Sequence, residues 1–392
     1  MSHSYITAAC RTPIGKLLGS LSSLPAPKLG AVAIAEVVKR AKIAPTEVDE
    51  VIFGNVLQAG VGQAPARQAA LFGGLPSTVA AVTVNKVCGS GLKAVVLADQ
   101  VIRAGDADCI VAGGMESMTK APHLLMGTRS GYKYGNEKLV DAMIHDGLWC
   151  AIENTAMGCA ADYTASSRGV NRADQDAWSF ESHKRAIAAR EAGKFQQEIV
   201  PVEVAAGKTK TTVTDDEGPR ADTTLERLAT LKPAFDPSGT VTAGNASQIS
   251  DGAAAVVVVS ESKRAELKPA WAFRIVASAT SGVEPKEIFI APVDAVRKCL
   301  QKAGRTVADV DLFEINEAFA SQTLACARAL EIDAAKLNVH GGAIALGHPI
   351  GASGARVLVT LIYALLDRGL KSGVATLCLG GGNAVAMLIE RE

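Results

Sequence analysis

Two cysteines, one histidine and one asparagine lie in segments where their side chains could take part in chemistry. Cys88 lies in VNKVCGSGLKAVVLA, where an apolar strand ends, two glycines permit a sharp turn and a helix begins. A thiol at a helix N-terminus meets a partial positive charge that favours the reactive thiolate, so Cys88 is a candidate nucleophile. The same context also suits a buried cysteine ahead of a glycine turn.

The other three residues supply groups that such a nucleophile needs. His348 lies in GGAIALGHPIGASGAR, a tightly specified loop in which a neutral imidazole could take the proton of Cys88, although a lone histidine can also be structural. Cys378 begins CLGGGNA at a strand end, where a second thiol could carry a proton to or from carbon and the glycines let backbone N–H groups face a cavity. Asn316 in FEINEAFA could hold a water or an oxyanion, or cap a helix.

The elements that position these residues follow an α/β pattern. Short β-branched runs alternate with Ala- and Leu-rich segments of helical period, which predicts buried strands sandwiched by helices. The segment VKRAKIAPTEVD ending at Asp49 aligns without gaps with LQKAGRTVADVD ending at Asp311, an offset of 311 − 49 = 262 positions. A glycine-rich turn, a helix, a strand and a Gly pair follow each copy. Two pseudo-equivalent halves would bring the turns at Cys88 and His348 to related positions.

The composition changes between the two halves. Strand-like runs thin out from about Ser117 to Ser250, where AAGKTKTTVTDDEGPR predicts a polar hairpin or loop and RADQDAWSFESHKRAIAAREAGKF predicts a surface helix. We therefore predict an N-terminal half formed by residues 1–117 with 251–268, an inserted loop domain over residues 118–250, and a C-terminal half over residues 269–392.

Composition and charge exclude several classes of protein. The 392 residues are 48% hydrophobic, enough for more than one core, and forty basic against forty acidic residues leave no net field to hold nucleic acid. No apolar run approaches about 18 residues, and the first residues match neither a secretory signal nor a transit peptide, so no membrane association is expected. Eight cysteines without a CxxC pair predict reduced thiols in the cytoplasm. Six of the cysteines are predicted to be small buried hydrophobic residues: Cys10, Cys109, Cys150, Cys159, Cys299 and Cys326.

The stretches CGSG, NEAF, GHPIGASG and CLGGGNA, in this order, closely resemble the thiolase family, and within it the acetyl-CoA acetyltransferase group. The resemblance runs from RTPIGK through GGMESM and LKPAF to the C-terminus. It implies two five-stranded βαβαβαββ halves in a layered αβαβα arrangement, an inserted loop domain that holds coenzyme A, and a homo-oligomer, either a dimer or a tetramer. It also implies acyl-CoA and CoA as substrates in fatty acid metabolism, with no metal or redox cofactor.

The resemblance also implies a role for each site residue. Cys88 would be the acylated nucleophile, His348 its base and Cys378 the acid/base at the substrate α-carbon. Asn316 would hold a water that forms one oxyanion hole with His348, while the N–H groups of Cys88 and Gly380 form the other. The implied reaction is the reversible Claisen condensation of two acetyl-CoA molecules to acetoacetyl-CoA and CoA. Coenzyme A would contact Arg220 with its adenine nucleotide and, along the pantetheine arm, Leu148, Met157, Ser247, Ala318 and Phe319.

One segment departs from the family pattern. Ala156-Met157-Gly158 stands where many short-chain members read His-Met-Gly and degradative members carry Pro. A methyl group in place of imidazole leaves space, so a branched or longer acyl group is a hypothesis for this chain. A degradative 3-ketoacyl-CoA thiolase of broader chain length is therefore an alternative, as is a non-catalytic acyl-CoA or lipid-binding protein on the same fold. A decarboxylating ketoacyl synthase would have no need for Cys378 as a base.

Overall fold

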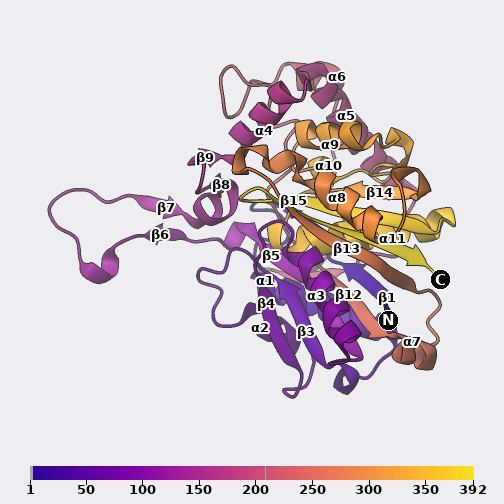
Figure 1. Ribbon diagram of the computed structural model, residues 1–392. Helices are drawn as coiled ribbons and strands as arrows, with labels where there is room; N and C mark the ends of the chain where they lie inside the picture. The colour runs from indigo at the N-terminus through magenta and orange to yellow at the C-terminus, as the bar shows by residue number, and fades with distance from the viewer. Residues whose placement is uncertain (1–2, 208) are drawn as a thin grey trace.

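A single mixed sheet of ten strands runs through the part of the chain that the computed structural model describes, residues 3–207 and 209–392 (Figure 1). The strand order is β14-β15-β16-β13-β1-β12-β5-β3-β4, with β2 paired to β12. The strands are β1 (Ser4–Arg11), β2 (Gly15–Lys16), β3 (Glu50–Gly54), β4 (Ala80–Val84), β5 (Cys109–Ser117), β12 (Ser250–Ser260), β13 (Phe273–Gly282), β14 (Leu312–Ile315), β15 (Ser372–Leu379) and β16 (Asn383–Arg391).

The two halves of the chain meet where β1 pairs with β13. Only Tyr5 and Ile6 pair with β13, whereas β1 pairs with β12 along almost its whole length. Within the described residues the second half contributes β13 to β16 to the sheet. The predicted fifth strand of this half is reduced to one parallel bridge between Phe313 and Leu337. The extended conformation ends there because the next residue, Asn338, has a left-handed φ of 46°.

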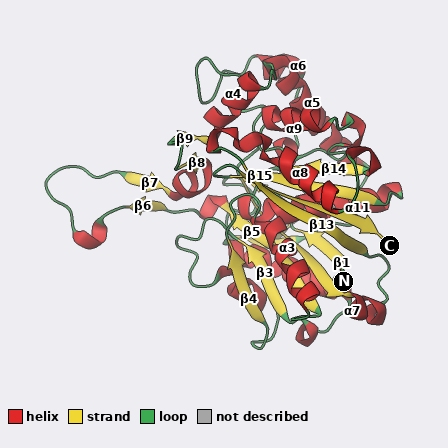
Figure 2. Cartoon of the chain, viewed as in Figure 1, coloured by secondary structure: helices red, strands yellow, loops and turns green. Residues whose placement is uncertain are grey.

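Helices cover both faces of this sheet (Figure 2). One face of the first half is covered by α1 and α2, and the corresponding face of the second half by α8 and α9. Between the halves lie α3 and α11, which gives the expected αβαβα layering and confirms the predicted thiolase fold. The helices of these layers are α1 (Ala26–Ala41), α2 (Pro65–Phe72), α3 (Ser90–Ala104), α8 (Ala291–Lys302), α9 (Ala320–Leu330) and α11 (Ile350–Arg368).

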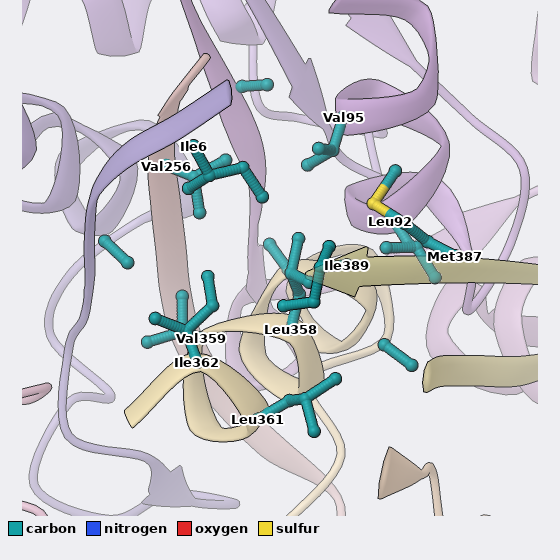
Figure 3. Packing of buried hydrophobic residues seen from close by; sticks show 14 of the residues in the cluster. Ile6, Leu92, Val95, Val256, Leu358, Val359, Leu361, Ile362, Met387 and Ile389 are labelled. Atoms are coloured by element: carbon teal, nitrogen blue, oxygen red, sulfur yellow. The ribbon is translucent and has the colours of Figure 1, made fainter. Parts of the chain in front are cut away.

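The central layer forms the largest apolar core (Figure 3). Leu92 of α3 and Leu358 of α11 pack with Ile6 and Val256 of the first half and Met387 of the second. Helix α11 is long and apolar enough to cross a membrane by composition, but 89% of its apolar window is buried inside the protein. It therefore serves as a core helix, and it carries the residues that follow His348.

The internal repeat predicted from the sequence is visible as a matched pair of contacts. The Asp49 carboxylate accepts hydrogen bonds from the N–H groups of Asp108 and Cys109, both at 2.9 Å, at the start of β5. The Asp311 carboxylate accepts the equivalent bonds from Lys371 at 3.0 Å and Ser372 at 2.8 Å, at the start of β15. Each aspartate thus ties the beginning of one strand to the parallel strand beside it in the sheet, β3 to β5 and β14 to β15.

The segment between β5 and β12 lies outside the ten-stranded sheet. It contains short strand pairs and helices, and the pair β6–β7 extends far from the rest of the molecule (Figure 1). The predicted polar hairpin is β10–β11, and the predicted surface helix is α5, which begins after Asn171 with the Asn171 Oδ1 accepting from the Asp174 N–H. The elements are β6 (His123–Leu125), β7 (Leu139–Asp141), β8 (Trp149–Cys150), β9 (Thr155–Ala156), α4 (Met157–Ser167), α5 (Arg172–Glu191), β10 (Val202–Ala206), β11 (Thr209–Val213) and α6 (Leu225–Ala229). The domain boundaries themselves stay a prediction.

Candidate active site

Cys88 lies in a tight turn between β4 and the N-terminus of α3. The preceding residue, Val87, has a φ of 47°, a conformation that is strained for a β-branched side chain. Ser90 Oγ accepts from the Lys86 N–H at 2.8 Å and donates to the Val87 carbonyl at 2.6 Å, so it closes the turn around the cysteine. This arrangement holds the Cys88 thiol just ahead of the helix rather than within it.

The expectation that the helix N-terminus favours a Cys88 thiolate is wrong for the unliganded protein. Burial raises the pKa of the Cys88 thiol to about 12, and the Glu116 carboxylate adds to this rise. Loss of hydration disfavours the thiolate more than the partial charge of the helix and a backbone hydrogen bond favour it. Cys88 is therefore a thiol at neutral pH and needs a base to become a nucleophile.

His348 is such a base, and its environment keeps it unprotonated. Burial, assisted by the Arg356 guanidinium, lowers the pKa of His348 to about 3. Ser353 Oγ lies 2.6 Å from His348 Nδ1 and 2.9 Å from the Pro349 carbonyl, so the ring can donate its Nδ1 proton to Ser353 while Ser353 donates to Pro349. The lone pair of the imidazole is then on Nε2, and it is available to accept a proton.

Asn316 is buried beside this imidazole. Its N–H donates to the Thr376 carbonyl at 3.0 Å, and its Nδ2 lies 3.5 Å from each of the two ring nitrogens of His348. The next helix, α9, has Phe319 and not Asn316 at its N-cap, so Asn316 does not have the capping role that the sequence left open. The adjoining Glu317 accepts from Trp178 Nε1, Ser182 Oγ, Asn338 Nδ2 and the Ile344 N–H, which fixes the turn that carries Asn316.

Cys378 and Gly380 come from the end of β15, which abuts the Cys88 turn. A Cβ placed on Gly89 would lie 2.2 Å from Leu379 Cδ2, and one on Gly380 would lie 3.2 Å from Val87 Cγ1. Burial raises the pKa of Cys378 well above its ordinary value, and the neighbouring Cys88 adds to the rise. Both thiols are consequently protonated at rest, and they are close enough to influence each other.

Four of these groups face one apolar cavity of about 380 Å³, whereas Asn316 is fully buried beside His348 and is not among the described residues that line the cavity. Cys88, His348, Cys378 and Gly380 line it together with all of the residues predicted for the pantetheine arm, Leu148, Met157, Ser247, Ala318 and Phe319. The Ser247 N–H donates to the Ala318 carbonyl at 3.0 Å, so the segment after α6 is tied to the turn that carries Asn316. Ala156, the residue at which the sequence departs from the family pattern, also lines the cavity.

Arg220 lies elsewhere, beside a second cavity of about 290 Å³ lined by Phe180, His183, Lys184 and Thr223 among others. The Arg220 N–H donates to His183 Nδ1 at 3.1 Å. Burial first, then the Arg220 charge, lowers the pKa of His183 to about 4, so this histidine is neutral at physiological pH. Two cationic side chains and a phenyl ring offer the groups that an adenine nucleotide needs.

Several residues near the cavity carried no signal in the sequence. Met143, Ile144, Phe235, Ile288 and Phe289 form much of its apolar wall. They could not be predicted because they lie far along the chain from the glycine-rich motifs. Of the six cysteines expected to be buried, five are, whereas Cys159 on α4 is half-buried.

Glu116 is a further unpredicted residue, and it holds the helix that follows His348. Its carboxylate accepts from the N–H groups of Val56, Leu57 and Gly351, the last at 2.9 Å. Burial raises the pKa of Glu116 to about 7 in spite of these hydrogen bonds. An acceptor at the first turn of α11 satisfies an N–H group that the helix itself leaves unpaired.

Two thiols, a neutral imidazole and backbone N–H groups around an apolar tunnel are the parts of an enzyme that transfers an acyl group through a thioester. Residues 4–262 match the family model described as thiolase, N-terminal domain, and residues 269–391 match thiolase, C-terminal domain. The chain belongs to the thiolase family, as its motifs predicted.

Bacterial acyltransferases are similar to this chain over their full length. The chain is 52% identical to an acetyl-CoA acetyltransferase of Pseudomonas aeruginosa and 48% identical to a probable acetyl-CoA acyltransferase of Staphylococcus aureus, each over 100% of both chains. The crystal structure of the Bacillus anthracis acetyl-CoA acetyltransferase superposes with a TM-score of 0.98 at 41% identity, covering 100% of this chain and 99% of that one. These similarities agree with the fold and with an acyltransferase activity.

Proposed function

We propose that this enzyme is an acetyl-CoA C-acetyltransferase that condenses two acetyl-CoA molecules reversibly to acetoacetyl-CoA and CoA. The observation that carries the proposal is the convergence of Cys88, His348, Cys378 and Gly380 on one apolar cavity of about 380 Å³. The full-length similarity to enzymes named acetyl-CoA acetyltransferase supports the choice of substrate.

The geometry suggests how the residues divide the reaction. His348 Nε2 takes the proton of Cys88 as the sulfur attacks the thioester carbonyl of the first acetyl-CoA, and CoA leaves with the proton of Cys378. The Cys378 thiolate formed in this way then removes a proton from the methyl group of a second acetyl-CoA, and the resulting carbanion attacks the acyl group on Cys88. The bond to the Cys88 sulfur breaks, acetoacetyl-CoA departs, and His348 returns its proton to the Cys88 thiolate.

Fixed donors lower the energy of the charged oxygens in both steps. The N–H groups of Cys88 and Gly380 would serve one oxyanion, and a water held by Asn316 together with His348 would serve the other. One such donor is typically worth about 3 kcal/mol because the site is shielded from water. Neither a metal nor a redox cofactor enters these steps, so we propose that none is required.

Arg220 is proposed to contact the adenine nucleotide of coenzyme A. It lines a different cavity from the cysteines, as expected for a ligand whose nucleotide and thioester ends bind apart and are joined by a pantetheine arm. The wall residues Met157, Ser247 and Phe319 would hold that arm. Replacement of Arg220 should then raise KM for acetyl-CoA and leave acylation of Cys88 possible at high substrate concentration.

Intact-protein mass spectrometry after mixing with acetyl-CoA tests the proposal directly. A single acetyl adduct is expected on the native enzyme and on Cys378→Ser, and none on Cys88→Ser, while both variants turn over acetoacetyl-CoA poorly. An adduct that survives Cys88→Ser would overturn the assignment of the nucleophile. No adduct with any acyl-CoA, and no thiolysis, would instead favour a binding protein.

A degradative 3-ketoacyl-CoA thiolase of broader chain length is the second candidate. Ala156 and the wall residues Met143, Ile144 and Phe289 make the cavity apolar, which suits acyl chains longer than acetyl. The residues and the mechanism would be the same, and the reaction would run toward cleavage. Relative turnover of short and longer substrates distinguishes the two candidates.

We further propose that the enzyme is a homo-oligomer in the cytoplasm. The edge strand β4 exposes Val82, and α2 beside it exposes Leu71 and Phe72, which would be covered by a second copy. The protruding β6–β7 segment exposes Leu125, Tyr134 and other apolar side chains, which would suit a further contact between dimers. All eight cysteines are free, in keeping with a reducing compartment.

A further inference from the structure

A buried arginine and a buried glutamic acid lie side by side behind Asn316, outside the cavity and without an obvious structural use. Arg356 of α11 and Glu314 of β14 are each at most 2% exposed, and Arg356 Nη1 lies 4.0 Å from Glu314 Oε2. Among the described residues, neither carboxyl oxygen of Glu314 has a hydrogen-bond partner, and neither do Nε and Nη1 of Arg356. A pair so poorly satisfied is costly to bury, so its presence calls for a functional reason.

The remaining nitrogen of Arg356 supplies that reason. Nη2 of Arg356 lies 3.5 Å from Oδ1 of Asn316, and Asn316 Nδ2 lies 3.5 Å from the His348 ring on its other side. A guanidinium can only donate hydrogen bonds, whereas a carboxamide can turn by 180° to present either oxygen or NH₂. Turning Asn316 would place its NH₂ against the donors of Arg356, so the arginine selects the orientation in which Nδ2 faces His348.

Arg356 also acts on the second member of the same pair. It is the next cause after burial for the low pKa of His348, because a fixed positive charge nearby disfavours a second one on the imidazole. A single buried cation therefore orients the amide and helps to keep the ring neutral. Glu314 faces the cation on its other side, but burial raises the pKa of Glu314 to about 8 in spite of Arg356, so the acid is mostly protonated at neutral pH and balances little of the charge.

We propose that Arg356, supported by Glu314, is a positioning residue that holds the Asn316 carboxamide with its NH₂ group toward His348 and the water that would serve the oxyanion. The inference rests on the proposed function, since it gives Asn316 a part in stabilising an oxyanion. It adds residues that touch neither substrate nor cavity. Their effect on the reaction passes through Asn316 and, to a lesser degree, through His348.

The test uses a variant that is expected to fold. Replacement of a buried charged or polar pair by apolar residues of similar size is often neutral or stabilising, so Arg356→Met combined with Glu314→Leu removes both groups and leaves neither of them unpaired. We expect this double variant to keep a native melting temperature within a few degrees, to lose about 10- to 100-fold in kcat for acetoacetyl-CoA thiolysis, and to keep KM within about threefold. Arg356→Lys, which retains a donor-only cation, should recover part of the loss.

A double-mutant cycle separates positioning from general damage. In an Asn316→Ala background there is no carboxamide to orient, so adding the Arg356→Met and Glu314→Leu pair should lower kcat by less than about threefold further. Arg40→Met, at a half-buried arginine that pairs with Glu36, is the control, and its effect should be the same in both backgrounds. Losses that multiply for the Arg356 pair as well, or a kcat equal to that of the native enzyme, would overturn the inference.

Failure of the proposed function would look different. In that case the native enzyme itself would form no acetyl adduct on Cys88 and would cleave no acetoacetyl-CoA. If the native enzyme is active and only the cycle is additive, Arg356 has a structural role and the assignment of the catalytic groups stands.

Discussion

Ser353 Oγ lies 2.6 Å from His348 Nδ1 across the first turn of α11, and it also lies 2.9 Å from the Pro349 carbonyl. When the hydroxyl donates its one proton to Pro349, it serves the ring as an acceptor. This arrangement holds the ring in the tautomer whose Nε2 carries the lone pair. A base that takes a proton from Cys88 through Nε2 and returns one requires that tautomer.

Removing the Ser353 hydroxyl should therefore slow catalysis and leave the other catalytic groups in place. We expect Ser353→Ala to lower kcat for acetoacetyl-CoA thiolysis about tenfold, the effect of one hydrogen bond of about 1 to 1.5 kcal/mol. Steady-state kinetics measure this. The matched control is Ser179→Ala, which removes a buried helical hydroxyl bonded to the Gln175 carbonyl at 2.8 Å and should leave kcat unchanged. Equal losses in the two variants would mean that helix packing and not the tautomer is responsible.

The contact between Gly89 and Leu379 gives a second prediction. A methyl group on Gly89 would meet Leu379 Cδ2 at 2.2 Å, in a core where Leu379 is 1% exposed and has little room to move. Overpacking of this kind costs about 1 to 3 kcal/mol, so Gly89→Ala should lower the melting temperature by several degrees and slow acetylation of Cys88. Differential scanning calorimetry and adduct formation measure the two effects.

A control and a compensating variant sharpen that experiment. Gly282 lies at the end of β13 with nothing within 4 Å of an added Cβ, and its φ is not in the left-handed region, so Gly282→Ala should change neither quantity. Leu379→Val in the Gly89→Ala background should restore part of the lost stability because it removes bulk from the clash. If the double variant is worse than either single one, the two turns are not in the close contact described.

Much of this site could be predicted from the sequence because glycine-rich turns mark it. Cys88, His348 and Cys378 each adjoin glycines that permit close approach, and the repeat ending at Asp49 and Asp311 indicated two related halves. The tunnel residues Leu148 and Phe319 came only from the family resemblance, since nothing local distinguishes an apolar tunnel residue from an apolar core residue.

The other site residues could not be predicted, because they depend on contacts between segments far apart in the sequence. Glu116 lies 235 positions from Gly351, whose N–H it accepts, and Glu314 lies in an otherwise ordinary buried strand. The predicted Cys88 thiolate was wrong for a similar reason. The helix that favours the anion is visible in the sequence, whereas the burial that outweighs it arises when β15 packs over the turn.

Buried histidines should make the protein sensitive to acid. Burial lowers the pKa of His340 from 6.5 to about 4, so the folded protein holds it neutral and its contribution to stability is complete above pH 6.5 and is lost as the pH falls toward 4. We expect the free energy of unfolding of the native protein to fall, relative to His340→Gln, by about 2 kcal/mol between about pH 7.5 and 5. Urea unfolding at one fixed protein concentration measures the difference at each pH.

The comparison between variant and native protein isolates this one group. His183 and His348 shift in the same direction, but both are present in the two proteins and their contributions cancel. A difference in stability that does not change with pH would show that His340 titrates normally in the folded state. In that case its edge-on contact with Phe195 would not shield it from water.

The last prediction concerns the length of the acyl chain, which Ala156 should influence. Its methyl group lines the cavity at the start of α4, where a larger polar side chain would fill space and add a hydrogen-bonding group. We expect the native enzyme to cleave both acetoacetyl-CoA and 3-ketohexanoyl-CoA, and Ala156→His to lower kcat/KM for the longer substrate about 10- to 100-fold relative to the shorter one, the usual worth of one or two methylene contacts. Ala156→Val, which adds bulk without polarity, separates the two effects: a loss equal to that of histidine would assign the selectivity to volume. If the native enzyme cleaves only acetoacetyl-CoA, the space beside Ala156 does not receive the acyl chain, and the broader degradative role is excluded.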